Sequence, residues 1–330
     1  MTESYLQGKG HVEKPLAKEA VPVVPDHKLI RVIGEGASGQ VWLATNVMGT
    51  YRAIKVVSTR PFRSQKSLTQ EFHGLLKFEP VSRLHDGLVD ILQVGYNEEL
   101  GYLYYVMELA DDAANGRSFA PEQYRPRTLA HDLTRHKRLP IGECVRLGAA
   151  LSSALGFLHR QGLIHRDIKP SNIIFVNGFP KLADIGLVAG MSEQKSHVGT
   201  EGFIPNEGAG TVHADIYSLG KVLYEISTGL DRIKYPELPA DLGTGAEDQD
   251  LVQFNKIVLK ACRTVPFKRF KSAEHMMTAI LSFQFGANEA RKQETLRFRS
   301  KIFSLAGALV AASLLVLLVW RLIWLLKHPS

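Results

Sequence analysis

The sequence predicts a bilobal α+β protein, with a small β-rich N-terminal lobe, a larger helical C-terminal lobe and one C-terminal transmembrane helix. Short β-rich runs separated by turn residues occupy the chain up to about residue 110. Apolar residues at helical spacing dominate after that point, and a long uncharged run lies near the C-terminus. With 330 residues, of which 45% are hydrophobic, the chain is long enough to bury a sizeable core.

The N-terminal lobe is predicted over residues 29–110, after a flexible tail at 1–28 that three prolines interrupt. The strand-like run "KLIRVIG" leads into a glycine-rich turn, and "QVWLAT" and "YRAIKVV" follow it. Residues 65–78 have a helical pattern, and "LVDILQVG" and "YLYYVMELA" resemble two further strands. The lobe is therefore expected to be a mostly antiparallel sheet with one helix.

The C-terminal lobe is predicted over residues 111–285 and begins with a polar, proline-containing loop at 111–127. Apolar residues at helical spacing in "ECVRLGAALSSALGFLHRQG" and "HADIYSLGKVLYEISTG" predict two helices. Gly162 and Gly229 fit as the C-caps of these helices. Two more helices are expected at 251–262 and 272–283.

The transmembrane helix is predicted over residues 302–326, because the run from Ile302 to Trp320 carries no charge. A buried soluble helix is the alternative, but an apolar character on every face disfavours it. The preceding segment at 286–301 is basic, and only a short tail, 327–330, follows the span. This asymmetry predicts a single-pass protein with its main body in the cytoplasm. The basic segment is expected either to contact anionic lipid or to be a solvated helix face.

Composition excludes several other classes of protein. The net charge of +7 is weak support for nucleic-acid binding, because much of the excess lies beside the predicted span, and no nucleic acid is expected as a partner. Cys144 and Cys262 are the only cysteines. Two distant thiols indicate neither a disulfide framework nor a zinc cluster, and a reducing compartment is the simplest interpretation.

Two motifs of the N-terminal lobe point to phosphate binding. The run Gly34–Gly39 has the pattern G-x-G-x-x-G, whose glycines let a backbone approach phosphates closely. It lies between two predicted strands rather than between a strand and a helix, which disfavours a dinucleotide-binding motif. Lys55, in "RAIKVV", is flanked by apolar residues within a strand. The alternative for Lys55 is a surface lysine on an alternating strand.

Two motifs of the C-terminal lobe carry polar side chains in a fixed order. The run "LIHRDIKPSNIIF" contains Asp167, Lys169 and Asn172. In "FPKLADIGLVAG" the only acid, Asp184, stands among apolar residues, and a buried carboxylate requires a partner. The dipeptide at 177–178, Asn-Gly, predicts a hairpin turn between the two motifs. The hairpin would bring Asn172 and Asp184 together.

Together these motifs resemble those of the protein kinase family. The chain has H-R-D-x-K-P-x-N at 165–172, A-I-K at 53–55, and D-I-G at 184–186 in place of D-F-G. The resemblance covers roughly residues 29–283 and is to the Ser/Thr type, bacterial-like. It implies transfer of the ATP γ-phosphate to Ser/Thr hydroxyl groups of protein substrates, with ATP and Mg²⁺ as cofactors.

The resemblance assigns nucleotide binding to the N-terminal lobe and the connector that follows it. The glycine loop would cover the ATP phosphates, and Lys55 would pair with the α/β-phosphates. Met107 would be the gatekeeper, and Glu108 and Ala110 would offer backbone groups to adenine. The full nucleotide-binding set is Gly34, Gly36, Gly39, Val41, Lys55, Met107, Glu108 and Ala110.

The resemblance also assigns the catalytic roles in the C-terminal lobe. Asp167 would accept the proton of the substrate hydroxyl, and Lys169 would lie beside the transferring phosphate. Asn172 and Asp184 would bind Mg²⁺, a cation that favours oxygen ligands. His165 would be structural.

A carboxylate on the helix of the N-terminal lobe is expected to hold Lys55. Glu71 is the preferred residue, because Leu75 and Phe78 would lie on the helix face behind it. Glu79 is the rival, since "KFEPVSR" resembles a short insertion relative to the family.

Residues 184–207 resemble an activation segment. Thr200 would line its peptide-binding end, Glu207 would form a structural ion pair with Arg269, and Asp215 would cap the backbone of the catalytic loop. The candidate phosphorylation sites in the segment are Ser192, Ser196 and Thr200. Self-association of two chains would permit autophosphorylation.

Two alternatives to an active protein kinase share this fold. A membrane-anchored pseudokinase scaffold is disfavoured, because the catalytic residues and the glycine loop are all present. A small-molecule kinase is disfavoured by the protein-kinase character of the C-terminal lobe. Two positions depart from the family pattern: Ile185 replaces the usual Phe, and Asn206 replaces the usual Pro of A-P-E.

Overall fold

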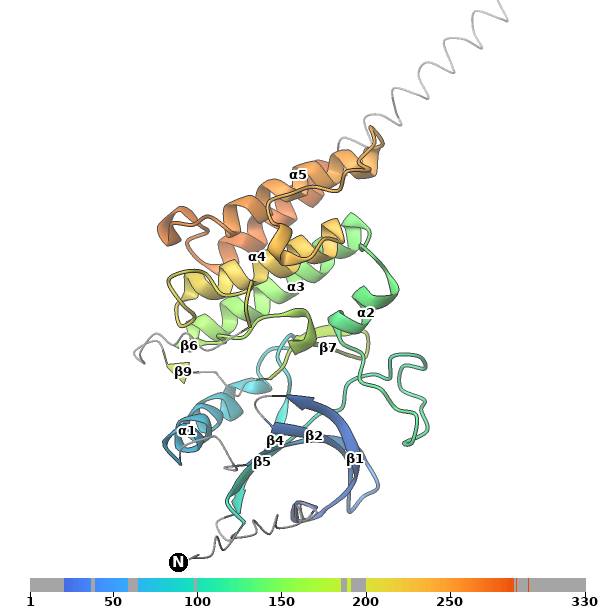
Figure 1. Cartoon of the computed structure of the whole chain (residues 1–330), viewed down its shortest axis with the longest axis vertical. Coiled ribbons are helices and arrows are strands. Elements are labelled where there is room, and N and C mark those ends of the chain that lie inside the picture. The colour runs from blue at the N-terminus through green and yellow to red at the C-terminus, as the bar shows by residue number, and fades with distance from the viewer. Residues whose placement is uncertain are drawn as a thin grey trace, which may run out of the picture.

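The computed structural model describes residues 21–36, 39–58, 65–97, 100–184, 189–190, 200–287, 289 and 296. They form a strand-rich N-terminal lobe and a helical C-terminal lobe (Figure 1). The predicted transmembrane helix at 302–326 lies outside the described residues, as does most of the segment 286–301. Within the described ranges, one helix, α3 (Ile141–Arg160), is long and apolar enough to cross a membrane, and most of it is buried in the helical lobe.

The N-terminal lobe is a five-stranded sheet of strand order β1-β2-β3-β5-β4, in which every neighbouring pair is antiparallel. This arrangement confirms the predicted sheet with one helix, α1 (Gln65–Ser82). The strands are β1 (His27–Gly36), β2 (Gly39–Asn46), β3 (Tyr51–Ser58), β4 (Ile91–Asn97) and β5 (Tyr102–Met107).

Helix α1 is longer than predicted and continues through Pro80. Pro80 has no N–H to donate to the carbonyl of Leu76, so the last turn of the helix has one backbone hydrogen bond fewer. Ser82 secures this end of the helix: its hydroxyl donates to the carbonyl of Glu79 at 2.8 Å and accepts the Ile91 N–H at 3.1 Å. The stretch 79–82 is therefore the last turn of the helix.

The folded domain also begins earlier than the predicted tail boundary at residue 28. Val24 is buried, and the hydroxyl of Tyr102 lies 2.8 Å from the Val23 N–H and 2.6 Å from the Val23 carbonyl. These contacts attach residues 23–24 to strand β5. Pro25, one of the prolines that predicted a tail, lies in the turn that the His27 N–H closes on the Val24 carbonyl, and proline is common in turns.

The C-terminal lobe is built on three central helices, α3, α4 (Val212–Thr228) and α5 (Ala246–Ala261), with a further helix over 273–287. A short helix, α2 (Leu129–Arg135), precedes them. Two short strand pairs lie at the border with the N-terminal lobe: β6 (Leu163–Ile164) with β9 (Ala189–Gly190), and the hairpin of β7 (Ile173–Val176) with β8 (Phe179–Leu182). The four helices predicted for this lobe are confirmed.

The predicted loop at 111–127 connects the two lobes on their outer side. The Arg31 side chain, from strand β1, donates to the Pro121 carbonyl at 2.9 Å and also to the Tyr124 carbonyl. The ring of Phe119 lies 5.1 Å from the ring of Tyr51, at the start of β3. The loop is thus attached to the sheet by these side-chain contacts as well as by the chain that leaves strand β5.

Helix α4 is the centre of the C-terminal lobe and packs closely on α5. It begins at Thr211, whose hydroxyl accepts the Ala214 N–H at 3.0 Å, and it ends at Gly229, whose φ of 69° is left-handed. At Gly220 an added Cβ would lie 2.7 Å from both Ala261 Cβ and Cys262 Sγ. A hydrogen atom at this position is what lets the two helices approach.

Both cysteines are buried in the core of this lobe, Cys144 in α3 and Cys262 at the end of α5. Burial raises the pKa of the Cys144 thiol and of the Cys262 thiol to about 12. The two residues therefore behave as small core side chains.

Substitution of Gly220 by alanine is expected to destabilise the domain, although alanine is the better helix former. The new methyl group has no room between α4 and α5, and overpacking of this kind costs about 1–3 kcal/mol. The midpoint of thermal unfolding should fall by several degrees. The control is Gly142→Ala in α3, where an added Cβ meets nothing within 4 Å; this variant should be as stable as the wild type or slightly more so. Equal stability of G220A and the wild type would contradict the close packing.

Candidate active site

The glycine-rich run joins strands β1 and β2, as predicted: Gly34 and Gly36 lie at the end of β1, and Gly39 begins β2. Gly34 lies opposite Val41, Val41 opposite Lys55 and Lys55 opposite Tyr105, so these residues form one row across the sheet. Residues 37–38, at the tip of the turn, lie outside the described residues. The row explains how residues far apart in sequence, Gly34 and Lys55, come to share one end of the sheet.

Gly39 occupies a position that requires glycine. Its φ is +126°, and an added Cβ would lie 2.2 Å from the Val56 carbonyl oxygen of the neighbouring strand β3. Any side chain there would force β2 away from β3. At Gly36, by contrast, an added Cβ would meet nothing within 4 Å.

Lys55 is nearly completely buried, with 3% of its side chain exposed, and forms an ion pair with Asp184. Burial acts to raise the pKa of the Asp184 carboxyl, but the charge of the Lys55 ammonium and its hydrogen bond outweigh burial and hold that pKa below its usual value. The pair joins the sheet of the N-terminal lobe to the segment after β8. Asp184 has a φ of 56°, a left-handed conformation uncommon for an aspartate.

Asp167 is the centre of a polar cluster in the C-terminal lobe. Its Oδ2 atom lies 2.8 Å from Lys169 Nζ, and it accepts a hydrogen bond of 2.8 Å from Asn172 Nδ2. Its Oδ1 atom accepts a 3.2 Å hydrogen bond from the hydroxyl of Thr200, which itself accepts from Lys169 Nζ at 2.8 Å. Three side chains of the motif at 165–172 and Thr200 of the predicted activation segment therefore form one cluster of direct contacts.

The β7–β8 hairpin brings Asn172 and Asp184 together, as the sequence predicts. Asn177 and Gly178 have φ values of 53° and 76°, as a type I′ turn requires, and the carboxylate of Asp111 accepts both of their N–H groups, at 3.0 and 2.8 Å. The Ala183 N–H donates to the Asn172 carbonyl at 2.8 Å. Asp184, the next residue, is thereby held beside Asn172.

The oxygen donors of Asn172 and Asp184 suit a divalent cation. Asn172 uses its Nδ2 group for Asp167, and among the described residues its Oδ1 atom has one long contact, of 3.5 Å, from Ser171 Oγ. An amide oxygen and a carboxylate are ligands that Mg²⁺ accepts. In the described part of the chain, no three His, Cys, Asp or Glu side chains are grouped so that they could hold a metal ion by themselves. Phosphate oxygens and water are further oxygen ligands that Mg²⁺ accepts.

Asp215 caps the backbone of the catalytic loop, which confirms the prediction for this residue. Its carboxylate accepts the N–H groups of His165 and Arg166, at 2.8 and 2.9 Å, and lies 2.9 Å from His159 Nε2. Burial acts to raise the pKa of Asp215, but the hydrogen bond and charge of His159 outweigh it and lower that pKa. Arg166 has a left-handed φ of 71°, and the two hydrogen bonds to Asp215 hold the loop in this shape.

The predicted ion pair of Glu207 and Arg269 is also confirmed. Arg269 contacts both carboxylate oxygens of Glu207, at 2.5 and 3.1 Å, and donates to the carbonyls of His213 and Arg263. Its side chain is completely buried. This network holds the corner that contains Asn206 although proline is missing there.

The connector after β5 carries an ion network that sequence reasoning missed. The Glu108 carboxylate contacts Lys181 Nζ at 2.5 Å and accepts the Asp90 N–H at 2.8 Å. Burial raises the pKa of Glu108, and the hydrogen bond from Lys181 opposes that rise. Lys181 stands in an apolar strand just as Lys55 does, so the same signal could have identified it.

Met107 ends strand β5 between Ala53 and Ile91, and it is largely buried. Next to it in the connector, the Ala110 carbonyl accepts a 3.0 Å hydrogen bond from the hydroxyl of Tyr124. This contact was also absent from the sequence prediction. It fixes the connector where the nucleotide base is expected.

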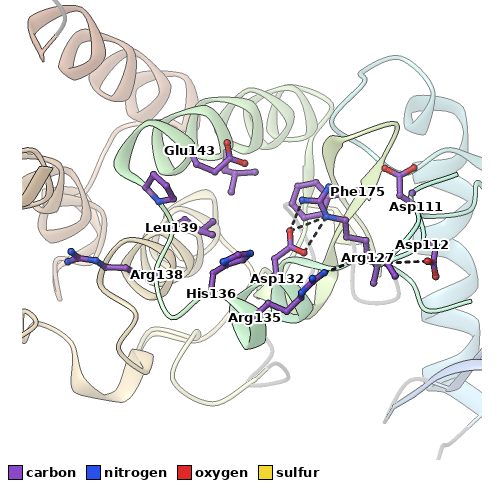
Figure 2. Close-up of a pocket in the computed structure, with 15 residues that line it drawn as sticks. Asp111, Asp112, Arg127, Asp132, Arg135, His136, Arg138, Leu139, Glu143 and Phe175 are labelled. Carbon is purple, nitrogen blue, oxygen red and sulfur yellow. Dashed lines mark hydrogen bonds and ion pairs between the residues drawn. The ribbon is translucent and has the colours of Figure 1, made fainter.

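A cavity of about 460 Å³ lies outside this cluster, between the chain after the connector, α2 and the start of α3 (Figure 2). Asp132 is held there by Arg127, at 2.8 Å, and the Arg127 guanidinium lies 4.2 Å from the centre of the Phe175 ring. Asp112 accepts the N–H groups of three residues of the loop. The carboxylates of Asp112 and Asp132 therefore stabilise the local fold.

Glu71 belongs to helix α1, but its side chain lies outside the described residues, so its pairing with Lys55 stays a prediction. The rival, Glu79, pairs at 2.5 Å with Arg83, which follows the last residue of the helix. Ile185, Ser192 and Ser196 also lie outside the described residues.

Comparison with known proteins identifies relatives over most of the chain. A family model described as protein kinase domain matches residues 27–284. The DNA damage-responsive serine/threonine-protein kinase RqkA of Deinococcus radiodurans is 31% identical over 217 residues, which are 62% of this chain and 30% of that protein. The serine/threonine-protein kinase PknA of Corynebacterium glutamicum is 27% identical over 313 residues, 87% of this chain and 61% of that protein. The serine/threonine-protein kinase PrkC of Bacillus subtilis is 26% identical over 277 residues, 77% of this chain and 40% of that protein.

This chain thus spans between 30% and 61% of the length of these three relatives. All the described residues of the polar cluster fall within the part that the family model matches. The bacterial relatives support a serine/threonine protein kinase. The chain belongs to the protein kinase family.

Proposed function

We propose that the protein is an active Ser/Thr protein kinase, which transfers the ATP γ-phosphate to hydroxyl groups of protein substrates. The observation that carries this proposal is the cluster around Asp167. A carboxylate, a lysine and a hydroxyl group are in mutual contact there, with distances of 2.8–3.2 Å. Phosphoryl transfer requires positioning and charge neutralisation more than covalent chemistry, and this cluster supplies both.

Within the proposed reaction Asp167 is the proton acceptor for the substrate hydroxyl. Its carboxylate is held by Asn172 and Lys169 at Oδ2 and by Thr200 at Oδ1, so its orientation is set before substrate arrives. Lys169 adds positive charge where negative charge accumulates during transfer. Thr200 belongs to the segment expected to bind the substrate peptide.

Nucleotide binding is proposed for the row across the N-terminal sheet and for the connector. Lys55 supplies a buried ammonium to the α/β-phosphates, and the backbone of the glycine turn covers them. Asn172 and Asp184 would hold Mg²⁺, which neutralises charge on the phosphates when it is bound. The Glu108 and Ala110 backbone would contact adenine.

We also propose that residues 302–326 anchor the kinase in a membrane, with the catalytic domain on the cytoplasmic side. The support is the uncharged run from Ile302 to Trp320 and the basic residues that precede it. Lipid headgroups are then expected to contact the segment 286–301. Anchoring in two dimensions would raise the local concentration of a second chain and favour autophosphorylation.

Substitution of Asp167 by asparagine is expected to lower kcat by about 10²–10⁴-fold, because the proton acceptor is lost. ATP binding should be unaffected, since the variant changes no residue of the N-terminal lobe. The measurement is transfer of labelled phosphate from ATP to a generic protein substrate by residues 1–290, followed by identification of the modified residues. Phosphate on Ser or Thr supports the proposal. ATP binding by the wild type without any transfer would instead favour a scaffold.

Removal of Mg²⁺ by a chelator is expected to abolish transfer, and added Mg²⁺ should restore it. Asp184→Asn should lose activity at Mg²⁺ concentrations that saturate the wild type, because a neutral amide is a weaker ligand than a carboxylate. Thermal unfolding of the variant shows whether the fold is intact. An Asp184→Asn protein with wild-type turnover would refute the role of Asp184 in metal binding.

The membrane anchor can be tested by cell fractionation of the full chain. The protein should sediment with membranes and resist extraction by salt, whereas a chain without residues 302–326 should become soluble. A chain without residues 2–20 is the control, because it is shortened without any change to the span. Recovery of the full chain in the soluble fraction would contradict the anchor.

A further inference from the structure

Arg232 lies against the turn that carries Thr200. It begins a short 3₁₀ turn, η3 (Arg232–Lys234), just after helix α4. Its Nε–H donates to the Glu201 carbonyl at 2.9 Å, and its guanidinium lies 4.6 Å from the centre of the Phe203 ring. At Gly202, which has a φ of +82°, an added Cβ would lie 2.9 Å from Arg232 Nε. One arginine side chain therefore covers residues 201–203.

The turn at 200–203 is fixed at both of its ends. The Phe203 N–H donates to the Thr200 carbonyl at 3.2 Å and closes the turn. The Phe203 carbonyl accepts a 2.8 Å hydrogen bond from Ser218 in α4. At the other end, the Thr200 hydroxyl contacts Asp167 and Lys169. The shape of this turn thus sets where the hydroxyl stands.

Arg232 is itself anchored to helix α4. The Glu225 carboxylate lies 3.3 Å from Arg232 Nη1 and accepts the Arg232 N–H at 3.1 Å. The Arg232 carbonyl accepts a 2.9 Å hydrogen bond from Lys221 Nζ. Glu225 and Lys221 are both buried in α4, so the arginine is held at its backbone and at its guanidinium.

We propose that Arg232 is a positioning residue that holds the turn at 200–203 and thereby keeps Thr200 on Asp167 and Lys169. The inference rests on the proposed kinase function. Contacts run from α4 through Arg232 to the turn, and from Thr200 to the proton acceptor. Arg232 touches none of the groups proposed to react, and it acts through the turn alone.

The guanidinium group is what this role requires. It donates from Nε to the Glu201 carbonyl, contacts Glu225 through Nη1, and presents a flat face to the Phe203 ring. A lysine at this position would keep the charge opposite Glu225 but would lack a donor along the stem and a planar surface. Because Ser218 still holds Phe203, loss of the guanidinium should loosen the turn without opening the core.

The test compares Arg232→Ala and Arg232→Lys with the full-length wild type. Both variants should have a kcat lower by about tenfold to a hundredfold, since misplacement of a reacting group by an ångström has effects of this size. Their KM for ATP should be unchanged, because the proposed nucleotide contacts are elsewhere, and Arg232→Lys should unfold at the wild-type temperature. Lys234→Ala, in the same 3₁₀ turn and exposed, is the matched control and should keep wild-type kcat.

A double-mutant cycle shows whether the effect passes through Thr200. Thr200→Ala alone should lower kcat, and addition of Arg232→Ala should cause no further loss, because residues that act through one contact are not additive. Multiplied losses, or an unchanged kcat in Arg232→Ala, would overturn the proposal.

Hydrogen exchange of the backbone gives a readout that does not depend on catalysis. Peptides that cover residues 200–205 should exchange faster in Arg232→Ala than in the wild type, and Lys234→Ala should match the wild type. Unchanged exchange would overturn the holding role of Arg232. If the wild type transferred no phosphate, the proposed function would fail, and the exchange rates would still decide whether Arg232 holds the turn.

Discussion

The two hydrogen bonds from the catalytic loop to Asp215 are the constraint on which the active site depends. This carboxylate is completely buried in α4 and accepts the N–H groups of His165 and Arg166. These hydrogen bonds stabilise the left-handed backbone of Arg166. The next residue is Asp167, so the direction of its side chain follows from the contacts of the two residues before it. Helix α4 therefore forms part of the core of the lobe and also positions the loop that carries the Asp167 carboxylate.

The sequence predicted the residues that carry chemistry better than it predicted their partners. The order of Asp167, Lys169, Asn172 and Asp184, and the Asn-Gly turn between the last two, are local signals, and the structure has the polar cluster and the hairpin. The links of Lys181 to Glu108 and of Tyr124 to Ala110 join residues 73 and 14 positions apart. Periodicity and turn chemistry contain no information on such pairs. The boundary at residue 28 was missed for the same reason, since Val23 is held by a distant tyrosine.

Two buried lysines connect the lobes in opposite directions, one from the N-terminal sheet and one from the C-terminal lobe. Lys55 reaches from the sheet to Asp184, and Lys181 reaches from β8 to Glu108 in the connector. Removing a charge from water is costly, so these ion pairs contribute little to the free energy of unfolding. They contribute more to fixing one position of the two lobes relative to each other. Both pairs involve the segment 181–184. Its position is thus tied to the sheet, to the connector and, through Ala183, to Asn172.

The burial of Cys144 and Cys262 makes thiol labelling a measure of transient opening of the native protein. A thiol reacts as the thiolate, and these two groups are both shielded and very weakly acidic. No other cysteine exists in the chain, and neither of these lies in the sheet. The rate at which an alkylating reagent labels the native protein consequently measures how often the helical lobe opens transiently. Opening of the N-terminal lobe exposes no cysteine and does not change the labelling rate. The two natural cysteines therefore probe the helical lobe specifically, without an engineered labelling site.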